Sequence, residues 1–107
     1  MKYINHIVED NEHIHRKKFN NIIGGVVEVT CASKMIGNEL FCGFAVKSPR
    51  ETSSNNKLAL MIARGRLRKA IETNTKTCYP DQRWLRHKDF LSFEDEILVK
   101  IENAKGL

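Results

Sequence analysis

Two stretches in the first half of the chain place apolar side chains at every second position. The apolar positions are Val27, Val29 and Cys31 in the first stretch and Leu40, Cys42, Phe44 and Val46 in the second. A period of two is the pattern of a β-strand with one buried face. Between the stretches lies the pair Gly37-Asn38, and a glycine-led pair suits a tight hairpin turn. The pattern therefore predicts an antiparallel hairpin.

The same pattern also predicts the register of this hairpin. With a two-residue loop at the glycine pair, Cys31 lies opposite Phe44 and Val29 lies opposite Val46. Apolar side chains of both strands then share one face. A shift of two residues preserves that face, whereas a shift of one moves a whole apolar set to the other face.

A long helix is predicted from about Asn56 to about Thr73. Pro49 ends the second strand, and Ser54 or Asn55 is the expected N-cap. At 100° per residue, one apolar stripe should lie on the sheet. It contains Leu60, Ala63, Leu67, Ala70 and Ile71.

A second, narrower apolar stripe on this helix consists of Leu58, Met61, Ile62 and Gly65. A helix with two apolar sides usually has two partners, and here the second partner is expected to be another copy of the chain. Gly65 costs about 1 kcal/mol of helix propensity relative to alanine, and close helix approach would be a reason to tolerate it. The alternative is that the stripe packs beneath the N-terminal segment.

The rest of the chain gives weaker signals. Residues 73–83 read as a loop, residues 84–93 as aromatic-rich with one short helical turn, and residues 1–20 as either helix or strand. Ile97, Val99 and Ile101 alternate with Glu96, Leu98, Lys100 and Glu102 and predict a third strand. The expected fold is a single α+β domain (residues 1–107), in which an antiparallel sheet, the hairpin plus this C-terminal strand, is packed by one long central helix.

Charge narrows the classes of partner. The 107 residues include 18 basic and 13 acidic side chains, for a net charge of +5, which favours nucleotides, nucleic acids or acidic protein surfaces. No apolar run reaches the length of a membrane span, and the N-terminus lacks the apolar segment of a signal peptide. Cys31, Cys42 and Cys78 show no paired spacing and are expected to be free thiols in the cytoplasm.

A strand, a loop of small polar residues and a helix in succession can direct backbone N–H groups and positive charge at a phosphate. The candidate ligand-binding residues are Ser53, Ser54 and Asn55 in the loop and Lys57, Arg64, Arg66 and Arg68 in the helix. Plain helix capping, a solvated basic face, or salt bridges to Glu28, Glu39 or Glu72 are the structural alternatives.

Aromatic residues near the C-terminus supply a possible surface for a nucleobase, with Trp84 and Phe90 as the candidates. The alternative is that they complete a small core. His6, His13 and His15 have no cysteine pairs beside them, so no metal site is predicted. No catalytic signature is present either, and we expect neither an enzyme nor a cofactor.

Residues 44–71, FAVKSPRETSSNNKLALMIARGRLRKAI, combine a strand, a Ser-Pro turn and a helix with an Ala-x-Gly-Arg core. This segment resembles small bacteriophage anti-defence proteins of the anti-Thoeris, signal-sponge kind. The resemblance covers about a quarter of the chain. It implies an oligomer that sequesters a cyclic nucleotide or cyclic ADP-ribose signal without cleaving it, in the cytoplasm of the host bacterium. It also implies that Ser53, Ser54, Arg64 and Arg66 lie at a phosphate-contacting edge between protomers.

The leading prediction is therefore a non-enzymatic binder of a phosphorylated nucleotide at an oligomer interface. The main alternative is a basic inhibitor that binds nucleic acid or an acidic effector, of the anti-CRISPR or anti-restriction type. A purely structural phage component is a third possibility.

Overall fold

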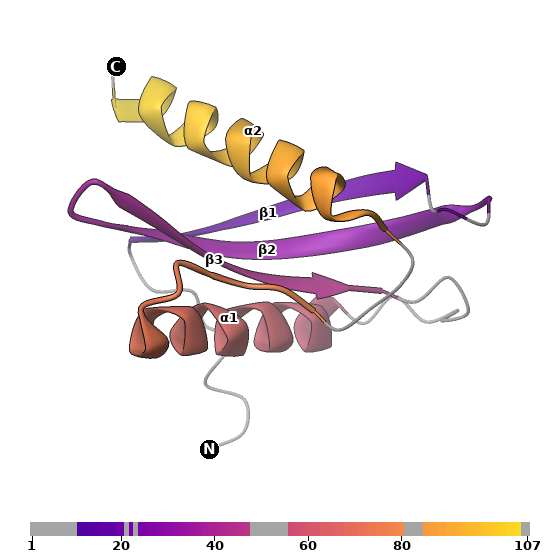
Figure 1. Cartoon of the computed structure of the whole chain (residues 1–107), viewed down its shortest axis with the longest axis horizontal. Helices are drawn as coiled ribbons and strands as arrows, with labels where there is room; N and C mark the ends of the chain where they lie inside the picture. Colours follow the sequence, from indigo (N-terminus) through magenta and orange to yellow (C-terminus); the bar gives the residue numbers. More distant parts are fainter. Residues whose placement is uncertain (1–10, 21, 23, 48–55, 81–84, 106–107) are drawn as a thin grey trace.

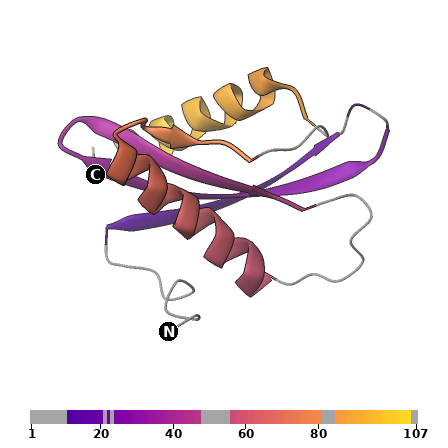
Figure 2. The same ribbon diagram turned by 60° about the horizontal axis from the view of Figure 1, so that its bottom comes forward.

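The computed structural model describes residues 11–20, 22, 24–47, 56–80 and 85–105. Two helices lie on opposite sides of one sheet, with α2 above it and α1 below it in Figure 1 and again in the turned view of Figure 2. The elements, in chain order, are β1 (Glu12–Asn20), β2 (Val26–Ile36), β3 (Glu39–Val46), α1 (Asn56–Thr73), β4 (Thr77–Cys78) and α2 (His87–Lys105).

The predicted hairpin and its register are confirmed. β2 and β3 pair antiparallel, with Cys31 opposite Phe44 and Val29 opposite Val46. Gly37 has a φ of 63°, a backbone conformation that glycine adopts at little cost. The turn and the apolar period therefore specify the same pairing.

The sheet is mixed and has the order β1-β2-β3-β4. β1 pairs antiparallel with β2, so residues 12–20 are strand, whereas residues 1–10 lie outside the described part of the chain. β4 occupies two residues of the expected loop and pairs parallel with β3. Asn74, with a φ of 54°, ends α1 in the left-handed conformation common at helix C-termini, and the chain then turns into β4.

α1 has the predicted bounds and packs on the sheet through the predicted stripe, since Ala63, Leu67 and Ala70 are fully buried. The helix crosses β3 at Gly43 in direct backbone contact. A Cβ atom added to Gly43 would lie 2.2 Å from the Leu67 nitrogen and 2.3 Å from the Ala63 oxygen. The close approach of α1 to the sheet therefore depends on the absence of a side chain at Gly43.

The prediction of a C-terminal strand is wrong, because residues 87–105 form α2. Ile97 and Ile101 are four residues apart and share the buried face of this helix with Phe90 and Phe93, while Val99 points away and is 54% exposed. Three alternating residues also fit a helix, since the outer two lie one turn apart. The described residues therefore form two helices, one on each side of the sheet, and the prediction of one long central helix is wrong.

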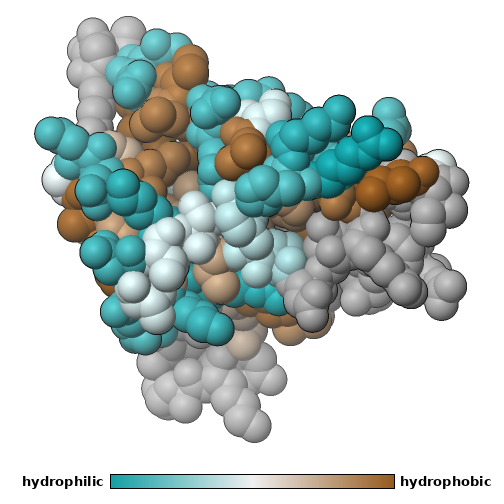
Figure 3. Space-filling view, viewed as in Figure 1, coloured by the Kyte–Doolittle hydropathy of each residue, from teal (hydrophilic) through white to brown (hydrophobic). Residues whose placement is uncertain are grey.

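The larger apolar core lies beneath α2. It contains the apolar face of the hairpin together with the buried face of α2, and Met35, Leu40 and Tyr79 pack against it. In the space-filling view, apolar side chains (brown) reach the surface between α2 and the tip of the β2–β3 hairpin (Figure 3). Neither described helix combines the length and apolar content that a membrane crossing requires.

Candidate functional site

Arg64 of α1, a candidate phosphate ligand, lies in the protein interior. Its side chain is 1% exposed and forms a bidentate ion pair with Glu12, the first residue of β1. The Nε atom donates to Oε1 at 3.0 Å, and the Nη2 atom donates to Oε2 at 2.7 Å. The pair links β1 to a helix 52 residues later in the chain. A salt bridge was one predicted alternative, but Glu12 was not among the predicted partners.

Arg66, the second candidate, is bonded to the backbone of β3. Its Nη1 atom donates to the Phe44 carbonyl oxygen at 2.6 Å. β4 ends at Cys78, which pairs with Gly43, so the Phe44 carbonyl lies one residue past the end of that ladder. Arg66 supplies the donor that a longer β4 would have provided.

Arg68 and Lys57 lie on the same flank of α1 as Arg64, by helical periodicity, and both are exposed. Within the described residues neither one is in an ion pair, which leaves their charges available to a ligand. The loop candidates Ser53, Ser54 and Asn55 lie outside the described residues, as does Trp84. Of the four candidates in the helix, Lys57 and Arg68 are therefore exposed. Arg64 and Arg66 instead bind other parts of the protein.

Phe90 lies in the core and is 4% exposed. Its ring packs edge-on against Phe44, with centroids 5.2 Å apart, and against Tyr79, with centroids 5.6 Å apart. A base approaching from solvent would have to displace these rings to stack on it. Phe90 therefore completes the core, as the alternative interpretation of this residue predicted.

The predicted oligomer interface lies on the outer face of α1, and we call it the α1 outer stripe (Leu58, Met61, Ile62 and Gly65). Leu58 and Ile62 are 49% and 39% exposed, and Met61 is half-buried. A Cβ atom built on Gly65 would have nothing within 4 Å beyond the helix itself. The stripe is thus an exposed apolar surface that ends, at its C-terminal end, in open space at Gly65.

A polar contact that the sequence did not predict links β4 to α2. Thr77 Oγ1 donates to Glu94 Oε1 at 2.9 Å, and the Tyr79 hydroxyl donates to the same oxygen at 3.0 Å. Burial, followed by the nearby Glu94 carboxylate, raises the pKa of Tyr79 to about 12. The hydroxyl therefore remains a donor at neutral pH. The sequence feature that could have indicated this contact is the spacing of Thr77 and Tyr79. They are two residues apart within residues 73–83, which were predicted to be a loop.

The α2 side of β1 carries a second polar group. His15 is half-buried, and its Nε2 atom lies 3.2 Å from Ser33 Oγ. Burial lowers the pKa of His15 to about 4, with further contributions from Lys100 and His13. Next to it, Lys17 forms an ion pair with Glu96 of α2. These contacts place one flank of α2 over β1.

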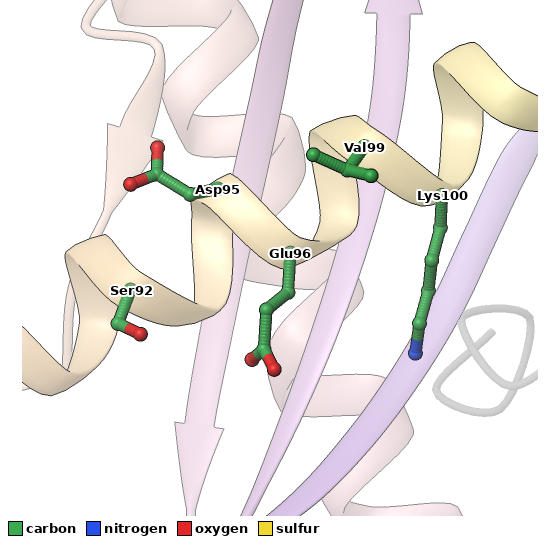
Figure 4. A pocket seen from close by; sticks show the side chains of 5 residues that line it. All are labelled: Ser92, Asp95, Glu96, Val99 and Lys100. Atoms are coloured by element: carbon green, nitrogen blue, oxygen red, sulfur yellow. The ribbon is translucent and has the colours of Figure 1, made fainter.

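That flank of α2 carries a shallow hollow of about 430 Å³. Its lining residues are Ser92, Asp95, Glu96, Val99 and Lys100 (Figure 4). In the figure, Ser92, Glu96 and Lys100 extend to the same side of the helix. Val99 is the apolar member of this otherwise polar set.

Metal-ligating and thiol groups add no further site among the described residues. No group of three or more His, Cys, Asp or Glu side chains is placed there to hold a metal ion. Cys31 and Cys42 are buried free thiols and Cys78 is a half-buried one. Burial raises the pKa of Cys31, so its thiol stays protonated.

Comparison of the chain with protein-family models, with curated proteins and with solved structures found no match. The resemblance to anti-Thoeris sponges at residues 44–71 stays a prediction.

Proposed function

We propose that this protein is a non-enzymatic phage anti-defence protein that sequesters a cyclic nucleotide or cyclic ADP-ribose-type signal in the host cytoplasm. The ligand would be held between copies of the chain that meet at the α1 outer stripe. The observation that supports this proposal is the combination of exposed Ile62 and open Gly65 with two exposed cations, Lys57 and Arg68, along one flank.

The charges explain how a ligand and an assembly would depend on each other. Two copies joined through this stripe bring two Lys57 and two Arg68 side chains close together. Like charges repel, so the empty assembly is disfavoured, and a phosphorylated ligand would relieve the repulsion. Ligand binding and self-association then strengthen each other by the same factor.

The contacts also revise the predicted roles of individual residues. Arg68 and Lys57 become the phosphate ligands, whereas Arg64 and Arg66 act as supports, because one holds Glu12 and the other the Phe44 carbonyl. Ser53, Ser54, Asn55 and Trp84 remain candidates for contacts to the ligand. Capture needs fixed donors and positive charge but no catalytic base, which is why the proposal is a binder.

Isothermal titration against cyclic ADP-ribose isomers and cyclic di- and trinucleotides tests the proposal. We expect one class to bind, and light scattering to show a larger particle with ligand. The variant Lys57→Ala/Arg68→Ala should bind about 100-fold more weakly, at about tenfold for each charged contact. Lys76→Ala/Lys88→Ala removes the same charge from exposed sites elsewhere and should change binding less than about twofold. Unchanged heats across the panel would end the proposal.

A second candidate, binding to nucleic acid or an acidic effector, is favoured by one observation. Arg16 and Lys18 are exposed on the same side of the sheet as α1, because Ile14 on that face of β1 packs with the α1-side core. Together with Lys57 and Arg68 they make this side of the molecule basic. Steep loss of affinity with rising salt would identify a nucleic acid, whereas capture of a small nucleotide gives a shallow dependence.

A further inference from the structure

β1 is a long edge strand. It has nine residues, compared with the about 5–6 of a typical strand, and among the described residues only β2 pairs with it. The outer edge of such a strand presents backbone N–H and C=O groups that another extended chain can bind. The opposite edge of the sheet, at β4, has only two residues.

β1 is held firmly in place by contacts on both of its faces. Glu12 at its start is fixed by Arg64 of α1, and Lys17 nearer its end is paired with Glu96 of α2. A partner that binds this edge therefore does not have to order the strand first, which lowers the entropic cost of binding.

The two faces of β1 offer different chemistry to a neighbouring strand. On the α1 side, Arg16 and Lys18 are exposed, and within the described residues neither is in an ion pair. On the α2 side, Phe19 is half-buried, and its ring packs edge-on against Phe93 of α2. A strand added to this edge would place alternate side chains against each of these two environments.

We propose that the outer edge of β1 binds an extended acidic peptide segment of a partner protein. The segment adds a fifth strand to the sheet. Its acidic side chains face Arg16 and Lys18, and its apolar side chains lie on the α2 side, next to Phe19. This surface is separate from the α1 outer stripe, so the inference does not depend on the proposed capture of a nucleotide.

The positive charge of β1 favours an acidic peptide over a second copy of β1 as the binding partner at this edge. If two copies of β1 paired antiparallel about Arg16, that residue would lie opposite itself, and like charges directly opposite each other are destabilising. Cations on an edge strand commonly prevent such self-pairing. The same cations attract an acidic strand, so they discriminate between partners as well as protect the edge.

The probe is a fluorescein-labelled peptide of nine residues that alternates glutamate and valine. Anisotropy should rise to saturation with this peptide but not with one that alternates lysine and valine. Arg16→Glu/Lys18→Glu should weaken binding at least about tenfold. Lys69→Glu/Lys88→Glu makes the same change in net charge at exposed positions outside the site and should weaken it less than about twofold. Equal effects of the two double variants would overturn the proposal.

Backbone pairing is tested with two N-methylated forms of the peptide, one methylated at every glutamate and one at every valine. Along a strand, alternate residues direct their N–H groups to opposite edges, so only one form loses the donors that face β1. We expect one form to lose binding and the other to keep it. Equal binding by both forms, or no binding of the parent peptide at about 1 mM, would overturn the proposal.

Amide hydrogen exchange should slow at alternate β1 positions when the peptide binds. A concentration-dependent dimer that forms through β1 without peptide would overturn the proposal in favour of self-pairing.

Discussion

The two sides of the sheet are held to their helices by different kinds of contact. On the α2 side, large apolar side chains such as Phe44, Phe93 and Ile97 form a continuous core. On the α1 side the backbones touch at Gly43, and the buried pair Glu12–Arg64 fixes the position of the helix. The α2 side should therefore tolerate apolar exchange, whereas the α1 side depends on particular atoms.

Removing one partner of the buried ion pair should have the largest effect. We expect Glu12→Ala or Arg64→Ala to lower the free energy of unfolding by about 3–5 kcal/mol, because each breaks a buried bidentate ion pair and keeps one of its charges in the interior. Urea denaturation measures the loss. The double variant Glu12→Leu/Arg64→Met should lose less than either single variant. The exposed pair Lys76–Glu39, 3.6 Å apart, is the control, and its disruption should cost less than about 1 kcal/mol.

Truncating a side chain in the α2-side core should lower stability almost as much, but a smaller apolar side chain should restore most of the loss. Phe93→Ala should lower the free energy of unfolding by about 3–5 kcal/mol, because it leaves a cavity among packed rings. Phe93→Leu should recover most of that loss, since apolar volume is what this side requires. Equal destabilisation by both substitutions in urea titrations would contradict the proposed tolerance.

Two glycines, Gly43 in β3 and Gly65 in α1, give a matched comparison of a filled and an open site. Gly43→Ala places a methyl group 2.2 Å from the Leu67 nitrogen, so α1 must move, at a cost of about 1–3 kcal/mol or more. Gly65→Ala adds the same methyl group where nothing lies within 4 Å and should raise stability by about 1 kcal/mol through helix propensity. Thermal denaturation of both variants checks that the signs are opposite.

The smallest expected effect is a pH dependence at the seam between β1 and α2. The pKa of His15 is lowered from 6.5 to about 4, so between these values the unfolded chain binds more protons than the folded one. Stability should therefore rise as pH increases from about 4 to 6.5, by about 1 kcal/mol after allowance for solvent screening. His15→Gln should flatten this rise in urea titrations at pH 4.5 and 7. An unchanged slope would show that other groups cause it.

Local signals were sufficient for the hairpin and for α1. The register follows from a period of two on both sides of Gly37, and the helix bounds follow from Pro49, the polar loop and the long apolar stripe. Both elements are specified by residues that are close together in the sequence. Short stretches of the sequence are therefore enough to predict them.

Two of the missed features are the type of the C-terminal element and the partners of Arg64 and Arg66, which are distant in the sequence. Ile97, Val99 and Ile101 match a strand over five residues, and only the four-residue spacing back to Phe93 shows the helix. The roles of Arg64 and Arg66 depend on Glu12 and the Phe44 carbonyl, 52 and 22 residues away. Residue type predicted a cation with a fixed partner but could not predict whether that partner is a ligand or the protein itself.

The hydrogen bond from Arg66 to the Phe44 carbonyl gives the sheet two unlike margins. Past the end of the two-residue strand β4, the Arg66 side chain already occupies the acceptor on β3 that an incoming chain would need, so further strands are discouraged there. Among the described residues, no side chain or strand occupies the outer backbone groups of β1 in this way. Any lengthening of this sheet, by a binding partner or in aggregation, should accordingly proceed in one direction.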